Sequence, residues 1–433
     1  MKKRLFIWPT ILLLLLLCFV ETTENNTFAD SSIDALNDVI AGLQSAPDNL
    51  GLKDKNGNVL FVPGDFSGYS GNPTNKALLL NSSASTTGVL RAIRMTSYKN
   101  ETAAMWSNVA NNNYIDLGQN QTLSMWLYFG DTRVTRADGM AFVMQNSDAG
   151  IKAFSNKNGS IAGGETLGTW AVDNDRDVSS NVDLAKTAIQ NSWALEFDTH
   201  VNNSATPGAA DYFDSGSNIT GQHIAYGEPG NFLTYNRQGT KPSYFMGTYL
   251  SGGYYYSMAH GEAQNVNLIN GQWHHLTLHW YATPGDQHIT YSFDDKNPDG
   301  SKGTDPKSAT VPVDTSLFGT VPNNKLRWGF TATTGDYYEP NLVAFESIPS
   351  LVEGDITSRI DDLTQDKTVE TNGTVNSGDK LGVNYLLKYQ SGNEDWSNIQ
   401  AKLILPSYVT YPTTGNVGTI TYSDGTIENI PAS

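Results

Sequence analysis

Short alternations of apolar and polar residues recur along most of the chain. They are separated by clusters of Gly, Asn, Ser, Thr and Asp, the residues that favour turns. Alternation with a period of two predicts strands, and a long series of short strands predicts sheets packed face to face. The pattern therefore predicts an all-β fold, a large antiparallel β-sandwich of jelly-roll type over residues 48–350. The clearest strands are predicted over residues 121–129, 139–145, 275–282, 288–294 and 326–334.

The first residues have a different pattern. Basic residues at positions 2–4 precede an apolar run over residues 5–20, and small residues lead up to Ala29. This arrangement predicts a secretory signal peptide, residues 1–29, which is removed by cleavage after Ala29. The apolar run is shorter than the roughly 20 residues of a membrane span. An uncleaved anchor is thus the weaker alternative, and no membrane insertion is expected after cleavage.

The segments on either side of the predicted sandwich also have their own patterns. Residues 30–47 place apolar side chains three or four positions apart, which predicts an N-terminal helical segment. Residues 351–377 are polar and are predicted to be a linker. Strand-like runs resume over residues 378–433, fewer than the roughly 100 residues of an immunoglobulin sandwich. We expect a partial, truncated immunoglobulin-like β module there.

Charge and cysteine content narrow the classes of function. The net charge is −17, which argues against nucleic acids and anionic membranes as partners and suits neutral glycans and divalent cations. The one cysteine, Cys18, lies in the predicted signal peptide, so no disulfide is expected in the mature chain. A secreted chain without cysteine is typical of a Gram-positive bacterium more than of a eukaryotic secretory route. The expected location is the cell surface (cell wall) of such a bacterium, or the medium.

One stretch, WALEFDTHVNN at 193–203, carries candidate chemistry. Alternation predicts one strand with Trp193, Leu195, Phe197, Thr199 and Val201 on one side. The other side then carries a polar row, Glu196, Asp198, His200 and Asn202. Two buried carboxylates side by side are costly unless a cation compensates them. Oxygen ligands suit Ca²⁺, and a carboxylate set completed by an imidazole suits a transition ion such as Mn²⁺. The candidate ligands are Glu196, Asp198, His200, Asn202, Asp211, Asp214 and His223, with Asp211 and Asp214 as alternatives for one bridging position.

These residues resemble the legume-type (L-type) lectin family, in its bacterial cell-surface branch. The family has a strand reading E-x-D-x-aromatic-x-N, followed by an Asp and a His-Ile, and the order is the same here. The resemblance implies a concanavalin-like sandwich. It also implies that Glu196, Asp198, one downstream Asp and His223 bind the transition ion. Asp198, the His200 carbonyl, Asn202 and the same downstream Asp would bind Ca²⁺.

Three further segments match the family and imply a sugar site. RADGMAFVM (136–144) implies that Asp138 accepts hydrogen bonds from sugar hydroxyls and that the Ala137–Asp138 peptide bond is cis. GGETLGTW (163–170) implies that the main-chain N–H of Gly163 or Gly164 contacts the sugar. RWGFTATTGDYYEPNLVAFES (327–347) contains the variable loop. The carbohydrate-binding residues implied by the resemblance are Asp138, Gly163, Gly164, Asn202, His200, Asp336 and Tyr337. His200 departs from the family, which has an aromatic residue at that position.

Two other histidine and aromatic clusters have simpler interpretations. His275 and His279 lie on one face of a predicted strand about 13 Å apart, too far to share an ion. The run GGYYYSMAH (252–260) could be a sugar platform, but a strand pair or crossing loop is the preferred interpretation.

The family resemblance predicts a secreted, Ca²⁺-dependent lectin or adhesin that binds glycans or glycoproteins on a host or neighbouring cell without turnover. One alternative is a protein-binding adhesin with a decayed sugar site, since fold alone does not decide function. Another is a glycoside hydrolase, which needs a second glutamate about 5–5.5 Å from the first. That residue would fall at His200 or Val201, so the sequence does not predict an enzyme.

Overall fold

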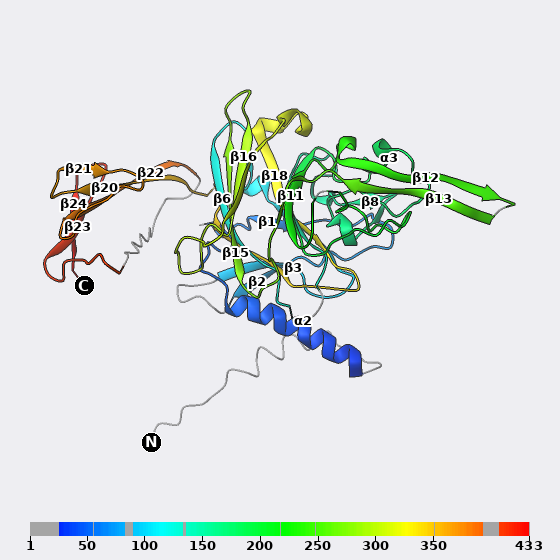
Figure 1. The fold of residues 1–433 in the computed structure, drawn as a ribbon, viewed down its shortest axis with the longest axis horizontal. Coiled ribbons are helices and arrows are strands. Elements are labelled where there is room, and N and C mark those ends of the chain that lie inside the picture. The colour runs from blue at the N-terminus through cyan, green and yellow to red at the C-terminus, as the bar shows by residue number, and fades with distance from the viewer. Residues whose placement is uncertain are drawn as a thin grey trace, which may run out of the picture.

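The computed structural model confirms an all-β fold with antiparallel sheets (Figure 1). It describes residues 26–54, 56–82, 90–132, 136–216, 218–246, 248–349, 351–392 and 407–432. Two large sheets pack face to face and form the sandwich predicted for residues 48–350. The finer boundaries of the predicted domains stay predictions.

The first sheet, which we call the front sheet, carries the candidate site. Its strand order is β1-β4-β18-β7-β10-β11-β14, and β5 pairs with β18 beside that path. Neighbours in space are far apart in sequence, so the site is assembled from distant segments. The strands are β1 (Phe61–Pro63), β4 (Thr102–Ser107), β5 (Ile115–Asp116), β7 (Gly139–Gln145), β10 (Ser192–Asp198), β11 (His223–Gly227), β14 (Gly261–Asn265) and β18 (Lys325–Thr333).

The second sheet, the back sheet, has the order β17-β16-β15-β6-β19-β3-β2. Its central strands come from segments whose alternation predicted strands, and all of its pairs are antiparallel. The strands are β2 (Leu78–Ser82), β3 (Leu90–Thr96), β6 (Gln121–Tyr128), β15 (Trp273–Tyr281), β16 (His288–Phe293), β17 (Lys307–Pro312) and β19 (Asn341–Ser347).

Alternation along the strands divides the buried side chains into layers. Phe142 on β7 and Phe197 on β10 point between the sheets, where they join Met125 of β6 in the main core. Val143 of β7 and Ala194 of β10, which pair with each other across the two strands, point to the opposite face of the front sheet. Loops from residues 153–189 cover that face, so both sides of the front sheet are buried. Polar groups on the loop-covered face are therefore shielded from water.

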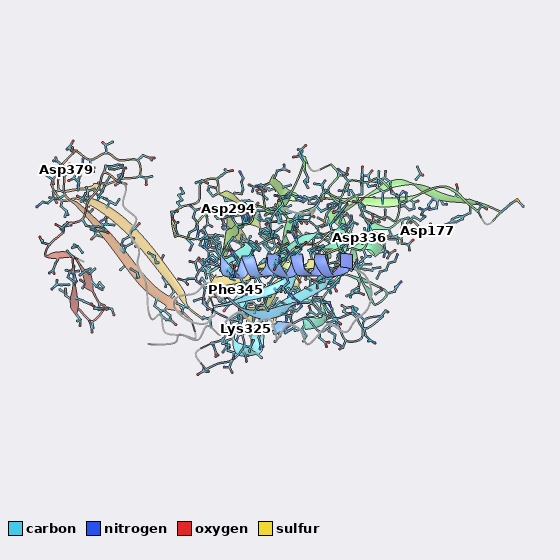
Figure 2. The ribbon with its side chains drawn as sticks, turned by 90° about the horizontal axis from the view of Figure 1, so that it is seen from below. Asp177, Asp294, Lys325, Asp336, Phe345 and Asp379 are labelled. Atoms are coloured by element: carbon cyan, nitrogen blue, oxygen red, sulfur yellow. The ribbon has the colours of Figure 1, made fainter. Side chains whose placement is uncertain are left out.

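A helix and a long hairpin extend this sandwich (Figure 1). Helix α2 (Asn26–Gln44) covers residues 30–44 of the predicted helical segment and packs on the outer face of the back sheet. Figure 2 shows the helix lying across the strands. Its residue Gly42 accepts a 2.9 Å hydrogen bond from the Trp273 indole. Strands β12 (Tyr235–Phe245) and β13 (Thr248–Met258) form a hairpin that projects from the front-sheet side, between β11 and β14 in sequence.

The C-terminal residues correct one prediction. Strands β20 (Glu353–Asp362) and β21 (Lys367–Val369) occupy much of the predicted linker 351–377. They form a sheet with β22 (Leu381–Ser391), and β20 pairs with β22 along its whole length. Pairing with a later strand explains why polar, exposed residues form a strand here rather than a linker. Strands β23 (Asn416–Thr421) and β24 (Ile427–Pro431) form a separate hairpin. The immunoglobulin-like character of residues 378–433 stays a prediction.

The predicted signal peptide lies almost wholly outside the described residues, because residues 1–25 are not among them. Its last four positions, 26–29, belong to α2. Within the described part of the chain, no helix combines the length and the apolar character required to cross a bilayer.

Candidate functional site

Strand β10 brings the first two acidic residues to the end of the front sheet. It pairs with β7 on one side and β11 on the other, and both of these antiparallel strands begin opposite Asp198. Glu196 and Asp198 share the loop-covered face and are 1% and 3% exposed. The strand stops at Asp198, so the polar row predicted as far as Asn202 is not one strand face. Without partner strands beyond this point, residues 199–202 form a loop instead.

That loop folds back and places Asn202 beside both downstream acids. The Asn202 main-chain N–H donates to Asp214 Oδ2 at 2.6 Å, and the Asp214 N–H donates to the Asn202 carbonyl at 3.0 Å. The Asn202 side-chain amide donates to Asp211 Oδ1 at 2.9 Å. Asp214 is buried, and its carboxylate lies close to that of Asp198 on β10. Asp211 is half-buried and contacts the side-chain amide of Asn202 instead. The geometry favours Asp214 for the bridging position.

Two imidazoles complete the cluster around Asp214. His223 Nε2 lies 3.5 Å from Glu196 Oε1 and 3.6 Å from Asp214 Oδ1. His260 Nε2 lies 3.3 Å and 3.2 Å from the same two oxygens. Side-chain ligand atoms of Asp198, Asp214 and His223 also lie within 4.8 Å of one another. Two overlapping groups of metal-ligand type therefore share His223.

The charges of this cluster fit bound cations. Burial raises the pKa of Asp198 well above its ordinary value, and the charges of Asp214 and Glu196 raise it further. Burial alone would lower the pKa of His260, but the charge of Glu196 and the contact with Asp214 reverse the shift and raise it. Among the described residues, the buried Glu196 Oε1 and His223 Nε2 have no hydrogen-bond partner. Buried polar atoms are rarely left in that state, so the donor set fits a divalent ion.

Asp138 lies at the start of β7, next to this cluster. Its peptide bond with Ala137 is cis, as predicted. Its N–H donates to the Thr333 carbonyl at 3.2 Å, and its own carbonyl accepts from the Thr199 N–H at 3.1 Å. The next residue, Gly139, has φ of 128° and allows β10 to approach, since a Cβ there would lie 2.3 Å from the Phe197 carbonyl oxygen.

The Asp138 carboxylate is buried but available for a ligand. Burial raises its pKa to about 7, and the nearby charge of Asp211 contributes to the shift. Its Oδ2 atom has no hydrogen-bond partner among the described residues. That oxygen lies 3.9 Å from the position where a Cβ on Gly335 would be. The carboxylate thus faces the loop between β18 and β19.

The glycine loop contacts the same end of the sheet. Thr333, which is paired with Gly139 in the strand register, donates its hydroxyl to the Gly164 carbonyl at 2.9 Å. Gly163 lies beside the Thr333 side chain, and both glycines are half-buried. Glu165 follows them and accepts a 3.0 Å hydrogen bond from the Tyr212 N–H. Glu165 therefore ties the glycine loop to the segment that carries Asp211 and Asp214.

Aromatic side chains stand at the rim. Tyr337 is 50% exposed, and its ring centre lies 6.2 Å from that of His200. Asp336, labelled in Figure 2, is exposed on the same loop. Tyr338 is buried against Tyr98 and is not presented to solvent. The loop thus offers one exposed ring and one carboxylate next to Asp138.

The structure also resolves the other clusters considered from the sequence. His275 contacts Asp295 and Glu346 at 2.6 Å each, while His279 contacts Thr122 at 2.9 Å. The tyrosine run at 252–258 forms β13, so the strand-pair interpretation is confirmed. His260, which follows that strand, was missed as a candidate ligand. No local spacing could reveal it, because the β12–β13 hairpin carries the chain away and back before His260 reaches Glu196.

A surface hollow of about 590 Å³ lies elsewhere on the sandwich. Asn265, His274, Asp294 and Lys307 are among its lining residues, and none of the predicted sugar or metal residues lines it. His274 is already held by Asp294 at 2.9 Å and the Leu268 carbonyl at 3.0 Å. The candidate site is thus the convergence of loops at the end of the front sheet.

No family model matches the chain, and no curated protein sequence matches it. Solved structures similar to it include peanut lectin with a nine-residue peptide, at 15% identity over 66% of this chain and 96% of that chain, TM-score 0.37. A Lotus tetragonolobus seed lectin aligns at 14% identity over 70% and 100%, TM-score 0.39. A lectin UEA-II complex with galactose aligns at 14% identity over 66% and 96%, TM-score 0.36.

Proposed function

We propose that this chain is a carbohydrate-binding protein of lectin type that holds glycans without chemical turnover. The observation that carries the proposal is the convergence of three segments at the end of the front sheet. Asp138 presents a buried carboxylate whose Oδ2 has no hydrogen-bond partner in the described part of the chain. The glycine loop contacts the adjacent strand end, and the carboxylate cluster lies next to both. Sugar hydroxyls suit this arrangement, because they can donate hydrogen bonds to a buried carboxylate and accept them from main-chain N–H groups.

Cations would hold the loop that carries Asn202. Asp198, Asn202, Asp214 and the His200 carbonyl would bind Ca²⁺ through oxygen atoms. Glu196, Asp198, Asp214 and His223 would bind a transition ion such as Mn²⁺. Bound ions would supply charge compensation for the buried carboxylates. The loop from Asn202 to Asp214 would then keep its position beside Asp138.

Each side chain of the proposed sugar site has its own task. Asp138 accepts hydrogen bonds from two sugar hydroxyls, while Asn202 and the N–H of Gly163 or Gly164 donate to them. Tyr337 packs on the apolar face of the ring, with His200 behind it. Asp336 lies at the rim, where it discriminates between sugars. Single-site affinity is expected near millimolar, or about −4 kcal/mol, and multivalent display would raise avidity.

The setting of this activity is also part of the proposal. The basic and apolar N-terminal residues support secretion, and the acidic composition supports neutral glycans as ligands. We place the protein at the surface of a Gram-positive bacterium, where it binds glycans or glycoproteins of a host or neighbouring cell.

A protein-binding adhesin is the second candidate, and one observation favours it. The β12–β13 hairpin projects from the sandwich and exposes Tyr244 and Met246 near its tip, at 58% and 90%. Exposed apolar groups on a projecting element suit contact with another protein. Binding that persists without any glycan, and that depends on these two residues, would support this candidate.

The substitution Asp138→Asn tests the sugar site. It keeps the shape of the side chain and replaces an acceptor oxygen with a donor, so glycan binding should be lost while the melting temperature is kept. Asp305→Asn, at an exposed acid outside the site, is the matched control. Glycan binding by the Asp138 variant at the level of the control would overturn the assignment of the site.

A further inference from the structure

His275 on β15 holds a carboxylate at each of its two ring nitrogens. Its Nδ1 atom lies 2.6 Å from Asp295 Oδ1, and its Nε2 atom lies 2.6 Å from Glu346 Oε2. The His275 side chain is 3% exposed, and its ring packs edge-on against Trp126 of β6, with 4.6 Å between the ring centres. Ser124, also of β6, donates to Glu346 at 3.4 Å, and neither of these β6 side chains carries a charge. One buried imidazole therefore joins β19 to the loop that follows β16.

Both contacts require the imidazolium form of His275. An ionised carboxylate only accepts hydrogen bonds, so each ring nitrogen that contacts one must carry a proton. A neutral imidazole has a single N–H, and its other nitrogen would face a carboxylate with lone pair against lone pair. The two separations of 2.6 Å are short, as charge-assisted hydrogen bonds are. The geometry of the cluster is thus that of a positively charged ring.

The neighbouring charges favour this form. Burial alone would lower the pKa of His275, but the contacts with Asp295 and Glu346 reverse the shift and raise it. Lys296 also contacts Glu346, and His275 and Lys296 together lower the pKa of Glu346 to about 2 against the effect of burial. Two cations and two carboxylates leave this cluster neutral. Loss of the His275 proton would give it a charge of −1.

Two other histidines of β15 have partners of their own. His274 lies on the opposite face of the strand and contacts Asp294 at 2.9 Å. His279 lies on the same face as His275 and contacts Thr122 at 2.9 Å. Burial lowers the pKa of His279, so its ring is neutral above pH 6.5. His275 is thus the histidine of this strand that holds two carboxylates.

The loop after β16, residues 294–305, is fastened to the back sheet at its beginning. Asp294, labelled in Figure 2, is its first residue. Each of the three consecutive residues 294–296 has a side-chain contact with β15 or β19. Lys296 and Thr304 of this loop line the surface hollow of about 590 Å³. The contacts of His275 therefore hold part of the wall of that hollow in place.

We propose that His275 is a proton-dependent latch that fastens the loop of residues 294–305 to the back sheet. The imidazolium holds both carboxylates, and a ring that has given its proton to water holds one, so the loop opens more often. Because the pKa of His275 is raised in the folded chain, the latch is complete below pH 6.5 and is lost as pH rises through the folded-state value. The residues of the latch belong to neither the proposed sugar site nor the proposed ion sites, so it operates without a glycan.

Histidine-selective ¹⁵N labelling of the chain tests the protonation of the ring. The chain has 7 histidines, and ring ¹⁵N shifts distinguish an imidazolium from both neutral tautomers. The signal that is absent from His275→Gln belongs to His275. We expect this ring to be mostly imidazolium at pH 6.5 and to titrate with a midpoint above that value. A ring that is already mostly neutral at pH 6.5 would overturn the proposal.

Hydrogen exchange measured by mass spectrometry follows the loop itself. Protection of residues 294–305 is normalised to the intrinsic exchange rate at each pH. Between pH 6 and pH 9 it should fall by about tenfold for each pH unit that separates the NMR midpoint from 6.5. His279→Gln should show the same fall, because it removes a histidine from the same strand face whose contact is a threonine. His275→Gln should show low protection at both pH values.

Two results would contradict the latch. One is protection of the wild-type loop that does not change with pH, and the other is an equal fall in His275→Gln. If His275→Gln does not fold, the proximity of the ring to Trp126 assigns the His275 signal. The wild-type titration and exchange profile then decide the question. Loss of glycan binding with an intact latch would overturn the proposed function and leave this inference standing.

Discussion

Arg136 and Asp38 form a buried ion pair between the N-terminal helix and the chain segment that leads into Asp138. The Arg136 guanidinium lies 2.6 Å from the Asp38 carboxylate, and the two side chains are 1% and 6% exposed. Arg136 also donates to the carbonyls of Asp131 and Tyr338. The Arg136 side chain, which lies just before β7, thus contacts both α2 and the loop that carries Tyr337.

Asp38→Asn should destabilise the fold and weaken glycan binding. Removing the Asp38 charge leaves the buried Arg136 guanidinium uncompensated, which costs free energy of folding. The remaining contact of Arg136 with Asp131 offsets only part of that cost. We expect the free energy of unfolding to fall by about 3 kcal/mol, measured by chemical denaturation. Asp34→Asn, at an exposed acid on the same helix, should change little. Equal stability of the two variants would mean that the helix does not depend on this pair.

Removal of divalent ions should lower the melting temperature by several degrees. An ion bound only by the folded chain at 100 times its Kd contributes about 2.7 kcal/mol. Melting curves in Ca²⁺, in EDTA and after Ca²⁺ is restored measure the effect. Asp214→Asn should lose this response, and Asp305→Asn should keep it. An identical melt in EDTA and in Ca²⁺ would mean that the buried carboxylates hold no stabilising ion.

Glu339→Gln should change how stability depends on pH. Burial raises the pKa of Glu339 to about 8, although Thr199 and Asn341 partly oppose the shift. Between pH 4.5 and 8 the folded chain holds a proton that the unfolded chain has lost, so its stability falls as pH rises. Glu339 alone lowers the free energy of unfolding by about 1.4 kcal/mol for each pH unit in that range.

Denaturation of Glu339→Gln over the same pH range provides the measurement. The variant should lack this contribution to the slope and should gain stability relative to wild type at pH 8. Parallel stability curves for the two proteins would show that Glu339 does not titrate in this range.

Tyr337→Ala should weaken glycan binding by about twofold to thirteenfold, the effect of losing one aromatic contact of about 0.5–1.5 kcal/mol. The melting temperature should not change, because the ring is half exposed. Tyr337→Phe should keep most of the affinity. Tyr244→Ala, on the hairpin, serves as a control for loss of an exposed ring. Full affinity in Tyr337→Ala would place the sugar elsewhere.

The sequence predicts the parts of the site that lie on continuous strands. Alternation over 193–198 separates Trp193 and Phe197 from Glu196 and Asp198, and the structure confirms that division. The end of β10 depends on where its antiparallel partners β7 and β11 begin, and the local alternation of residues does not contain that information. The same holds for β20, whose partner lies about 30 residues later. At both places the structure differs from the prediction because a strand's extent depends on the strand it pairs with, and not only on its own residue pattern.

Local sequence patterns also could not predict the contacts between residues far apart in the chain. His260 reaches Glu196 only because the β12–β13 hairpin returns the chain to the sheet edge. Asp38 lies in a helix whose apolar spacing predicted a buried face, but nothing in that spacing indicated Arg136 as its partner. The segments that the motifs single out, Asp138, the glycine loop and the acidic loop, meet at the ends of neighbouring strands. Their role in sugar binding stays a prediction.

The most direct measurement is a glycan array probed with the multimerised mature chain, once in Ca²⁺ and once in EDTA. We predict binding to a restricted class of glycans in Ca²⁺ and loss of that binding in EDTA, and we predict that Asp138→Asn binds no glycan in either buffer. Binding to no glycan in Ca²⁺, or equal binding in EDTA and by Asp138→Asn, would contradict this prediction.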